Sequence, residues 1–192
     1  MIFPNKKGEE SVILCGREGT GLTDEERAAL LTVWIERCSE PLLRMCFMQL
    51  RDYALAEDVL QETLIKAWRA MPKYERQPIL HEKAWLMRIA INACHDVQRS
   101  RWMRHASATI ALEDLPQASA AVMPEDRALF LDICALPDKF REVLLLYYYQ
   151  RLSMRDVAQV LGIDVSTVHA RLKKAEELLK RKLTEEDGHE EQ

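Results

Sequence analysis

Apolar residues recur at intervals of three and four positions through most of residues 24–183, the spacing that places them on one face of an α-helix. Leu30, Leu31 and Trp34 begin this pattern. Glycine, which often marks the turns between strands, is scarce: the chain has six, and four of them precede Leu22. The pattern therefore predicts an all-α protein.

Capping residues and prolines set the expected helix boundaries. Thr23 with Glu26 forms a capping box, so the first helix is expected to begin there. Pro41 is expected to open a second helix and Met71-Pro72 to end a third, because proline supplies no N–H to a helix interior. The expected helices begin at 24 and 41 and then cover about 55–70, 82–102, 125–135, 138–150, 154–161 and 166–183.

The stretch 105–124 separates two helical blocks. It lacks helical periodicity, is rich in Ala and Ser, and is longer than most connections inside a compact domain. We therefore expect two small helical domains joined by a flexible linker. The expected segments are an N-terminal extension (1–23), a first domain (24–104), the linker (105–124), a second domain (125–183) and an acidic tail (184–192).

The formal net charge of -4 does not exclude a nucleic-acid partner. The tail 184–192 holds five acidic residues and no basic one, which more than accounts for the negative sum. The two helical blocks are close to neutral, and their basic residues are clustered. Because attraction to phosphate decays over a Debye length of about 8 to 10 Å, clustering matters more than the total charge.

Several function classes are not expected. No apolar run reaches the ~20 residues of a membrane span, and the N-terminus lacks the apolar core of a signal peptide. The five cysteines are far apart, without a Cys-x-x-Cys pair, which indicates reduced thiols in a cytoplasmic protein and no metal site. We find no paired nucleophile and base, no glycine-rich phosphate loop and no catalytic residue, so neither an enzyme nor a cofactor is expected.

A helix-turn-helix is predicted at residues 152–172. Ser153 begins a short helix, Gly162 ends it with a tight turn, and a longer helix follows. In such a motif the second helix enters the DNA major groove. An ordinary helical hairpin with a solvated basic face is the alternative. The side chains expected to face outward on the second helix are His169, Ala170, Arg171, Lys173 and Lys174.

The predicted helix at 55–70 carries acid and amide groups on the face opposite its apolar stripe. This face is either a solvated surface or a docking surface for a basic partner. The run Ala-Glu-Asp-Val-Leu-Gln-Glu-Thr-Leu-Ile-Lys-Ala-Trp at 56–68 resembles the second conserved region of the sigma-70 family, in its extracytoplasmic-function group. Residues 85–92 are similar to the promoter-melting helix of that group, and 135–183 to its fourth region. The loop between Tyr74 and Trp85 looks longer than is usual there.

The resemblance implies three sets of contacts. Contacts with the clamp helices of the largest polymerase subunit are implied for Asp58, Gln61 and Glu62. Contacts with the minus-10 element are implied for Tyr74, placed in the loop after the third helix, and for Arg88, Asn92, Asp96, Arg99, Arg101 and Arg104. Contacts with the minus-35 element are implied for Thr167, His169, Ala170, Arg171, Lys173 and Lys174.

The implied function is that of a cytoplasmic sigma factor, without membrane insertion, that lends promoter recognition to RNA polymerase. Its implied partners are core RNA polymerase, bound at the clamp helices and the flap, promoter DNA and an anti-sigma factor. The alternative is a ligand-sensing helix-turn-helix regulator that is not a polymerase subunit. That alternative predicts an apolar ligand pocket in the N-terminal block and tight DNA binding without polymerase.

Overall fold

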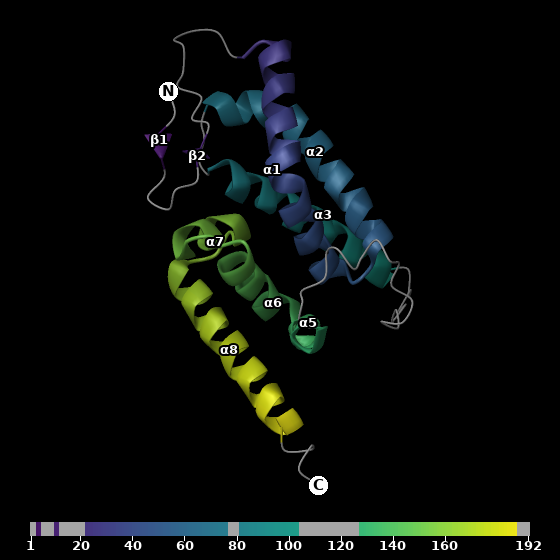
Figure 1. The fold of residues 1–192 in the computed structure, drawn as a ribbon, viewed down its shortest axis with the longest axis vertical. Coiled ribbons are helices and arrows are strands. Elements are labelled where there is room, and N and C mark those ends of the chain that lie inside the picture. The colour runs from purple at the N-terminus through teal and green to yellow at the C-terminus, as the bar shows by residue number, and fades with distance from the viewer. Residues whose placement is uncertain (1–2, 5–9, 12–21, 77–80, 104–126, 188–192) are drawn as a thin grey trace.

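The computed structural model describes residues 3–4, 10–11, 22–76, 81–103 and 127–187 (Figure 1). Within these residues, strands β1 (Phe3–Pro4) and β2 (Glu10–Ser11) pair antiparallel, and every other element is helical, which confirms the predicted fold class. None of the described helices combines the length and apolar character that crossing a membrane needs. The helices are α1 (Asp24–Leu50), α2 (Tyr53–Arg76), α3 (Glu82–Met103), α5 (Arg127–Ala135), α6 (Asp138–Leu144), the π-helix η2 (Leu145–Tyr149), α7 (Met154–Leu161) and α8 (Val165–Asp187).

Helix α1 begins at the predicted capping box. The Thr23 hydroxyl accepts from the Glu26 N–H, and the Glu26 carboxylate accepts from the Thr23 N–H. The predicted helix start at Pro41 is wrong, because α1 continues through this proline to residue 50. Cys38 and Leu42 are buried on either side of Pro41, and their packing holds the helix together where proline removes one backbone hydrogen bond.

Helix α2 corrects a second predicted boundary. The Asp52 side chain accepts from the Leu55 N–H near its start, and the helix runs through Pro72 to Arg76 instead of ending at Met71. Met71 is fully buried, which anchors the turn containing the proline. Tyr74 therefore lies in α2 and not in a loop. Residues 75–76 and 82–84, half of the predicted loop between Tyr74 and Trp85, lie in α2 and α3.

The first three helices form the N-terminal block. Helix α2 packs on α1, and α3 packs on both. Trp34 of α1 is buried and meets Trp85 of α3 edge to face, with ring centroids 5.4 Å apart. Val59 and Ala67, both in α2, are also buried. Burial of a large apolar side chain stabilises a fold by roughly 1.5 to 3 kcal/mol, so these residues fix the arrangement of the block.

The C-terminal block contains the predicted helix-turn-helix. Ser153 and Asp156 form a capping box at the start of α7. Gly162 ends that helix at a φ of 66°, a left-handed conformation that glycine adopts at low cost. Val157 of α7 and Val168 of α8 are fully buried in the angle between the helices. The motif predicted from sequence is confirmed as a fold element.

The two blocks also pack against each other, which the sequence did not predict. Helix α7 contacts α3, and α6 contacts α1, so the C-terminal helices lie directly beside the N-terminal block (Figure 1). Phe130 of α5 stacks on Phe47 of α1, with centroids 5.6 Å apart and planes 14° apart. Both rings are buried. The predicted linker 105–124 lies outside the described residues.

Candidate nucleic-acid and partner interfaces

Helix α2 presents its acid and amide groups to solvent. Asp58, Gln61 and Glu62 are all exposed, whereas Val59 and Thr63 are buried on the opposite side of the helix. Glu62 is not an isolated charge, because Lys66 Nζ lies 2.9 Å from its carboxylate one turn later. The structure thus places the three predicted docking residues together on one accessible face.

Ile65 adds an apolar group to the same face of α2. Its side chain is 51% exposed, although isoleucine is among the residues most often buried. Residues 58, 61, 62 and 65 follow the i, i+3, i+4, i+7 spacing of one helical stripe. The sequence analysis did not single out Ile65. It could have been found, because Ile65 lies at helical spacing from the polar residues 58, 61 and 62 and not from the buried apolar residues. We refer to Asp58, Gln61, Glu62 and Ile65 as the α2 outer face.

Helix α3 exposes a row of polar residues. Arg88, Asn92 and Asp96 follow one another at four-residue spacing, and all are exposed. The charge of Asp96 is partly compensated, because Arg99 Nη2 lies 2.6 Å from Asp96 Oδ1. The structure brings four of the seven predicted minus-10 residues to one surface of α3. Tyr74 and Arg101 lie in α2 and α3, but their side chains are outside the described structure, as is all of Arg104.

Helix α8 presents a mixed polar surface at its start. His169, Ala170, Lys173 and Lys174 are exposed, as predicted, while Val168, Leu172 and Ala175 are buried beneath them. Lys174 Nζ lies 3.2 Å from Glu177 Oε2, an ion pair on the solvated side of the helix. The four exposed residues therefore form one continuous stripe that a DNA groove could contact.

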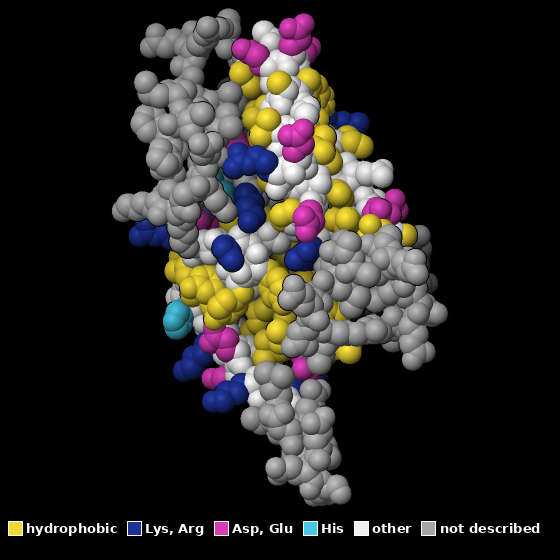
Figure 2. Space-filling view, in the orientation of Figure 1, with side chains coloured by type: hydrophobic (Ala, Val, Ile, Leu, Met, Phe, Trp, Pro, Cys, Tyr) yellow, Lys and Arg dark blue, Asp and Glu magenta, His cyan; other side chains and the backbone are white. Residues whose placement is uncertain are grey.

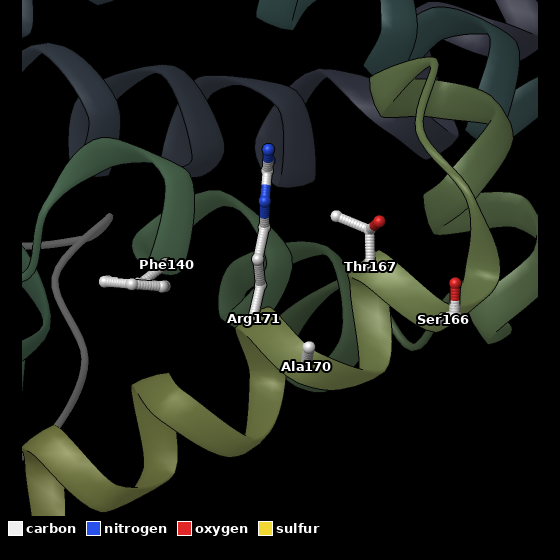
Figure 3. Close-up of a pocket in the computed structure, with 5 residues that line it drawn as sticks. All are labelled: Phe140, Ser166, Thr167, Ala170 and Arg171. Carbon is white, nitrogen blue, oxygen red and sulfur yellow. The ribbon is translucent and has the colours of Figure 1, made fainter.

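Arg171 departs from this stripe. It is half-buried, as is Thr167, and both side chains point to the same side of α8, into a pocket of about 430 Å³ (Figure 3). Phe140 of α6, Ser166 and Ala170 complete the lining. Arg171 is therefore less exposed than its neighbours His169, Ala170 and Lys173, although the sequence predicted that all of them face outward. Arg171 lies at the edge of the exposed stripe.

Charge is distributed unevenly over the surface. On the face drawn in Figure 2, Lys and Arg side chains gather along α1 and where it meets the C-terminal helices, among apolar and a few acidic groups. Such a grouping supports attraction to phosphate despite the acidic total. Among the described residues, no three His, Cys, Asp or Glu side chains are arranged to hold a metal ion.

Comparison with known proteins identifies the family. The chain matches the family models Sigma-70 region 2 over residues 34–104 and Sigma-70, region 4 over residues 133–179. ECF RNA polymerase sigma factor SigL of Mycobacterium tuberculosis (strain ATCC 25618 / H37Rv) is 33% identical over 165 residues, which cover 82% of this chain and 91% of SigL. ECF RNA polymerase sigma factor SigW of Bacillus subtilis (strain 168) is 29% identical over 160 residues, which cover 75% of this chain and 83% of SigW.

A solved structure shows the same fold. The sigma factor RpoE of Bartonella quintana, crystallised with the anti-sigma factor NepR, matches 85% of this chain and 98% of its own with a TM-score of 0.63 and 24% identity. Both conserved regions lie in this chain in the order that the resemblance implied. The chain therefore belongs to the sigma-70 family of RNA polymerase sigma factors, in the extracytoplasmic-function group.

Proposed function

We propose that this chain binds core RNA polymerase through the α2 outer face and directs it to promoters by reading the minus-35 and minus-10 elements. The observation that carries the proposal is the coexistence of two exposed surfaces in one chain of this family, an acidic and amide face on α2 and a basic helix-turn-helix stripe on α8. Sigma factors are transcription initiation factors, so the chain acts by recognition and not by catalysis.

The α2 outer face has the composition of a binding surface. Ile65 supplies apolar area that becomes dehydrated on contact, and Asp58, Gln61 and Glu62 supply acceptors for a basic partner. Affinity in such interfaces is concentrated in a few residues near the centre. The proposed partner surface is the clamp helices of the largest polymerase subunit, with the flap holding the C-terminal block.

The proposed promoter contacts follow the two exposed surfaces. Arg88, Asn92, Asp96 and Arg99 of α3, with Tyr74, Arg101 and Arg104, are assigned to the minus-10 element. Unstacking a base costs a few kcal/mol, which polar and aromatic contacts to the extruded base can offset. The residues assigned to the minus-35 element are Thr167, His169, Ala170, Arg171, Lys173 and Lys174.

The proposed domain division is that of the sequence, with residues 24–104 binding polymerase and the minus-10 element and 125–183 binding the minus-35 element. Linking two weak DNA-binding modules to one polymerase raises their effective concentration at the promoter, so each module can bind weakly alone. We assign the chain to the cytoplasm, where polymerase is found. An anti-sigma factor is a further proposed partner, since the structural relative RpoE was crystallised with one.

A ligand-sensing regulator is less well supported. The pocket described above lies between α6 and α8, at the edge of the helix-turn-helix, and not in the N-terminal block where that function requires it. Two measurements distinguish the two functions. Pull-down of core polymerase by the full chain, lost when Asp58 and Gln61 are both changed to Ala, supports a sigma factor. Tight promoter binding without polymerase, together with no pull-down, would support a regulator.

A further inference from the structure

The π-helix η2 lies between α6 and the helix-turn-helix. Its first two residues, Leu145 and Leu146, are buried, whereas Tyr148 is 51% exposed. The Gln150 N–H donates to the Leu145 carbonyl, so this turn holds one residue more than a turn of an α-helix. Wide turns of this kind frequently occur at functional sites. From this turn the Tyr148 side chain reaches α8.

Tyr148 bonds to Glu176 of α8, the second helix of the helix-turn-helix. Its hydroxyl donates to Glu176 Oε1 at 2.6 Å. The Tyr147 ring meets the Tyr148 ring edge to face, with centroids 5.0 Å apart, and so restricts its rotation. The hydrogen bond to Glu176 raises the pKa of the Tyr148 hydroxyl above its ordinary value, and burial and the neighbouring Glu176 and Tyr147 act in the same direction. The hydroxyl therefore remains a proton donor at neutral pH.

A second acid and lysine on α8 show what a carboxylate does at the same spacing. Glu177 follows Lys174 by three residues, and its Oε2 lies 3.2 Å from Lys174 Nζ. Glu176 follows Lys173 by three residues as well, and side chains at this spacing are neighbours on a helix surface. Glu176 instead accepts the hydrogen bond from Tyr148. Within the part of the chain that the structure describes, Lys173 has no ion-pair partner.

The position of Glu176 beside the exposed stripe of α8 gives this difference a consequence. Residues three apart in an α-helix lie about 60° from each other around the axis, and Glu176 is displaced from Lys173 toward η2. A Glu176 side chain released from Tyr148 is within reach of the Lys173 ammonium. Pairing there would neutralise a charge that attracts phosphate, since such attraction acts over about 8 to 10 Å. The bond to Tyr148 keeps the carboxylate off the stripe.

We infer that Tyr148 is a positioning residue for promoter recognition: its hydroxyl holds Glu176 on the η2 side of α8 and so leaves Lys173 available to the phosphates of the minus-35 element. The inference rests on the proposed function, because the charge of Lys173 acts here through contact with DNA. Tyr148 acts through Glu176 and needs no contact with DNA of its own. Neither residue belongs to the set assigned to the minus-35 element.

The salt dependence of promoter binding tests the inference. The full chain with core RNA polymerase is titrated with a promoter fragment on which the wild type initiates, at several salt concentrations. Tyr148→Phe removes only the hydroxyl, so Glu176 becomes free to pair with Lys173. We expect binding to weaken about threefold to tenfold and the slope of log affinity against log salt to fall by about one, as for the loss of one phosphate contact.

Glu176→Gln provides the rescue, because glutamine has no charge to pair with Lys173. Adding it to Tyr148→Phe should restore the wild-type salt slope and at least the wild-type affinity. In a Lys173→Ala chain, Tyr148→Phe should have no further effect, because the lysine through which it acts is absent. A merely structural role of Tyr148 predicts neither result. Tyr147→Phe is the matched control, since it removes the hydroxyl of the neighbouring ring and should change neither affinity nor slope.

Circular dichroism establishes that each variant keeps its helices. A folded Tyr148→Phe chain with the wild-type affinity and salt slope would overturn the inference, as would a weakened variant that Glu176→Gln fails to restore. Initiation by the wild type separates this result from failure of the proposed function. A wild type that initiates, beside a Tyr148→Phe variant that binds equally well, refutes the inference alone. A wild type that directs no initiation refutes the proposed function, and the inference with it.

Discussion

Arg141 of α6 donates a hydrogen bond from Nε to Oε1 of Gln49 at the end of α1, 3.1 Å away, and both side chains are buried. The two residues are 92 positions apart in sequence. A fully buried guanidinium is stable only when its donors are satisfied, and here they bond to a side-chain amide, three carbonyls and a carboxylate. This contact makes the relative position of the two blocks specific.

We predict that Arg141→Ala lowers the free energy of unfolding of the full chain by about 3 to 5 kcal/mol, because it leaves a cavity and several buried acceptors without their donor. Urea denaturation followed by circular dichroism measures this change. Arg69→Ala, on the exposed side of α2, should change the free energy by less than about 0.5 kcal/mol. Equal midpoints for the two variants would show that Arg141 is not a structural centre of the interface.

Ile65→Ala should weaken association with core polymerase by about 10-fold or more, corresponding to about 1.4 kcal/mol or more, because it removes the exposed apolar group of the α2 outer face. Binding of labelled chain to core enzyme measures the affinity. Ile35→Ala is the matched control, since Ile35 is 41% exposed on α1 and lies outside the α2 outer face. If both variants bind as tightly as the wild type, Ile65 is not part of the polymerase interface.

Arg171→Ala should reduce discrimination at one base pair of the minus-35 element by about 1 to 3 kcal/mol if the guanidinium makes a bidentate contact to guanine. Arg171 lines the pocket beside Phe140, at the edge of the exposed stripe of α8. Lys174→Ala should instead weaken binding to all sequences alike, as expected for a phosphate contact. Transcription from promoters with single minus-35 changes distinguishes the two effects. An Arg171→Ala variant with the wild-type sequence preference would contradict the assignment.

Acidity should stabilise the packing of the two blocks against each other, because His95 Nε2 of α3 lies 2.5 Å from Glu142 Oε1 of α6. The hydrogen bond to Glu142 raises the pKa of His95 above its ordinary value; Asp138 acts in the same direction, and burial and Arg99 oppose them. A histidine whose pKa is raised by folding contributes stability that is fully present below its unfolded-state pKa of about 6.5. This stability is lost as pH rises through the higher folded-state pKa. The radius of gyration of the free chain should therefore increase as pH rises above about 6.5 and through the raised folded-state pKa of His95.

His95→Lys provides the control for this pH dependence, because lysine stays protonated throughout that range. The variant should show a weaker pH dependence than the wild type. A wild-type radius that is constant or that falls with rising pH would contradict the expected sign. Unchanged pH dependence in His95→Lys would remove His95 as its source.

The helices and the helix-turn-helix could be predicted because their signals are local. Thr23 with Glu26 and Ser153 with Asp156 cap their helices through residues three positions apart, and Gly162 supplies the left-handed turn. The prolines misled the prediction. Pro41 and Pro72 lie inside long helices, because burial of neighbouring apolar residues offsets the hydrogen bond that each proline removes.

The interface between the blocks could not be predicted, because it depends on residues distant in sequence. Nothing near Gln49 indicates that it meets Arg141, and nothing near His95 indicates Glu142. The candidate site was predictable in part. The three polar residues of the α2 outer face follow from helical spacing and are exposed, whereas the half-buried position of Arg171 depends on α6.

The central claim is that this chain gives RNA polymerase its promoter specificity. The most direct measurement is transcription by purified core RNA polymerase, with and without the full chain, on a library of promoter fragments. We predict transcripts that depend on the chain, arise from a restricted promoter set and are lost when Asp58 and Gln61 are both changed to Ala. No chain-dependent initiation from any fragment, with an active core enzyme, would contradict the account.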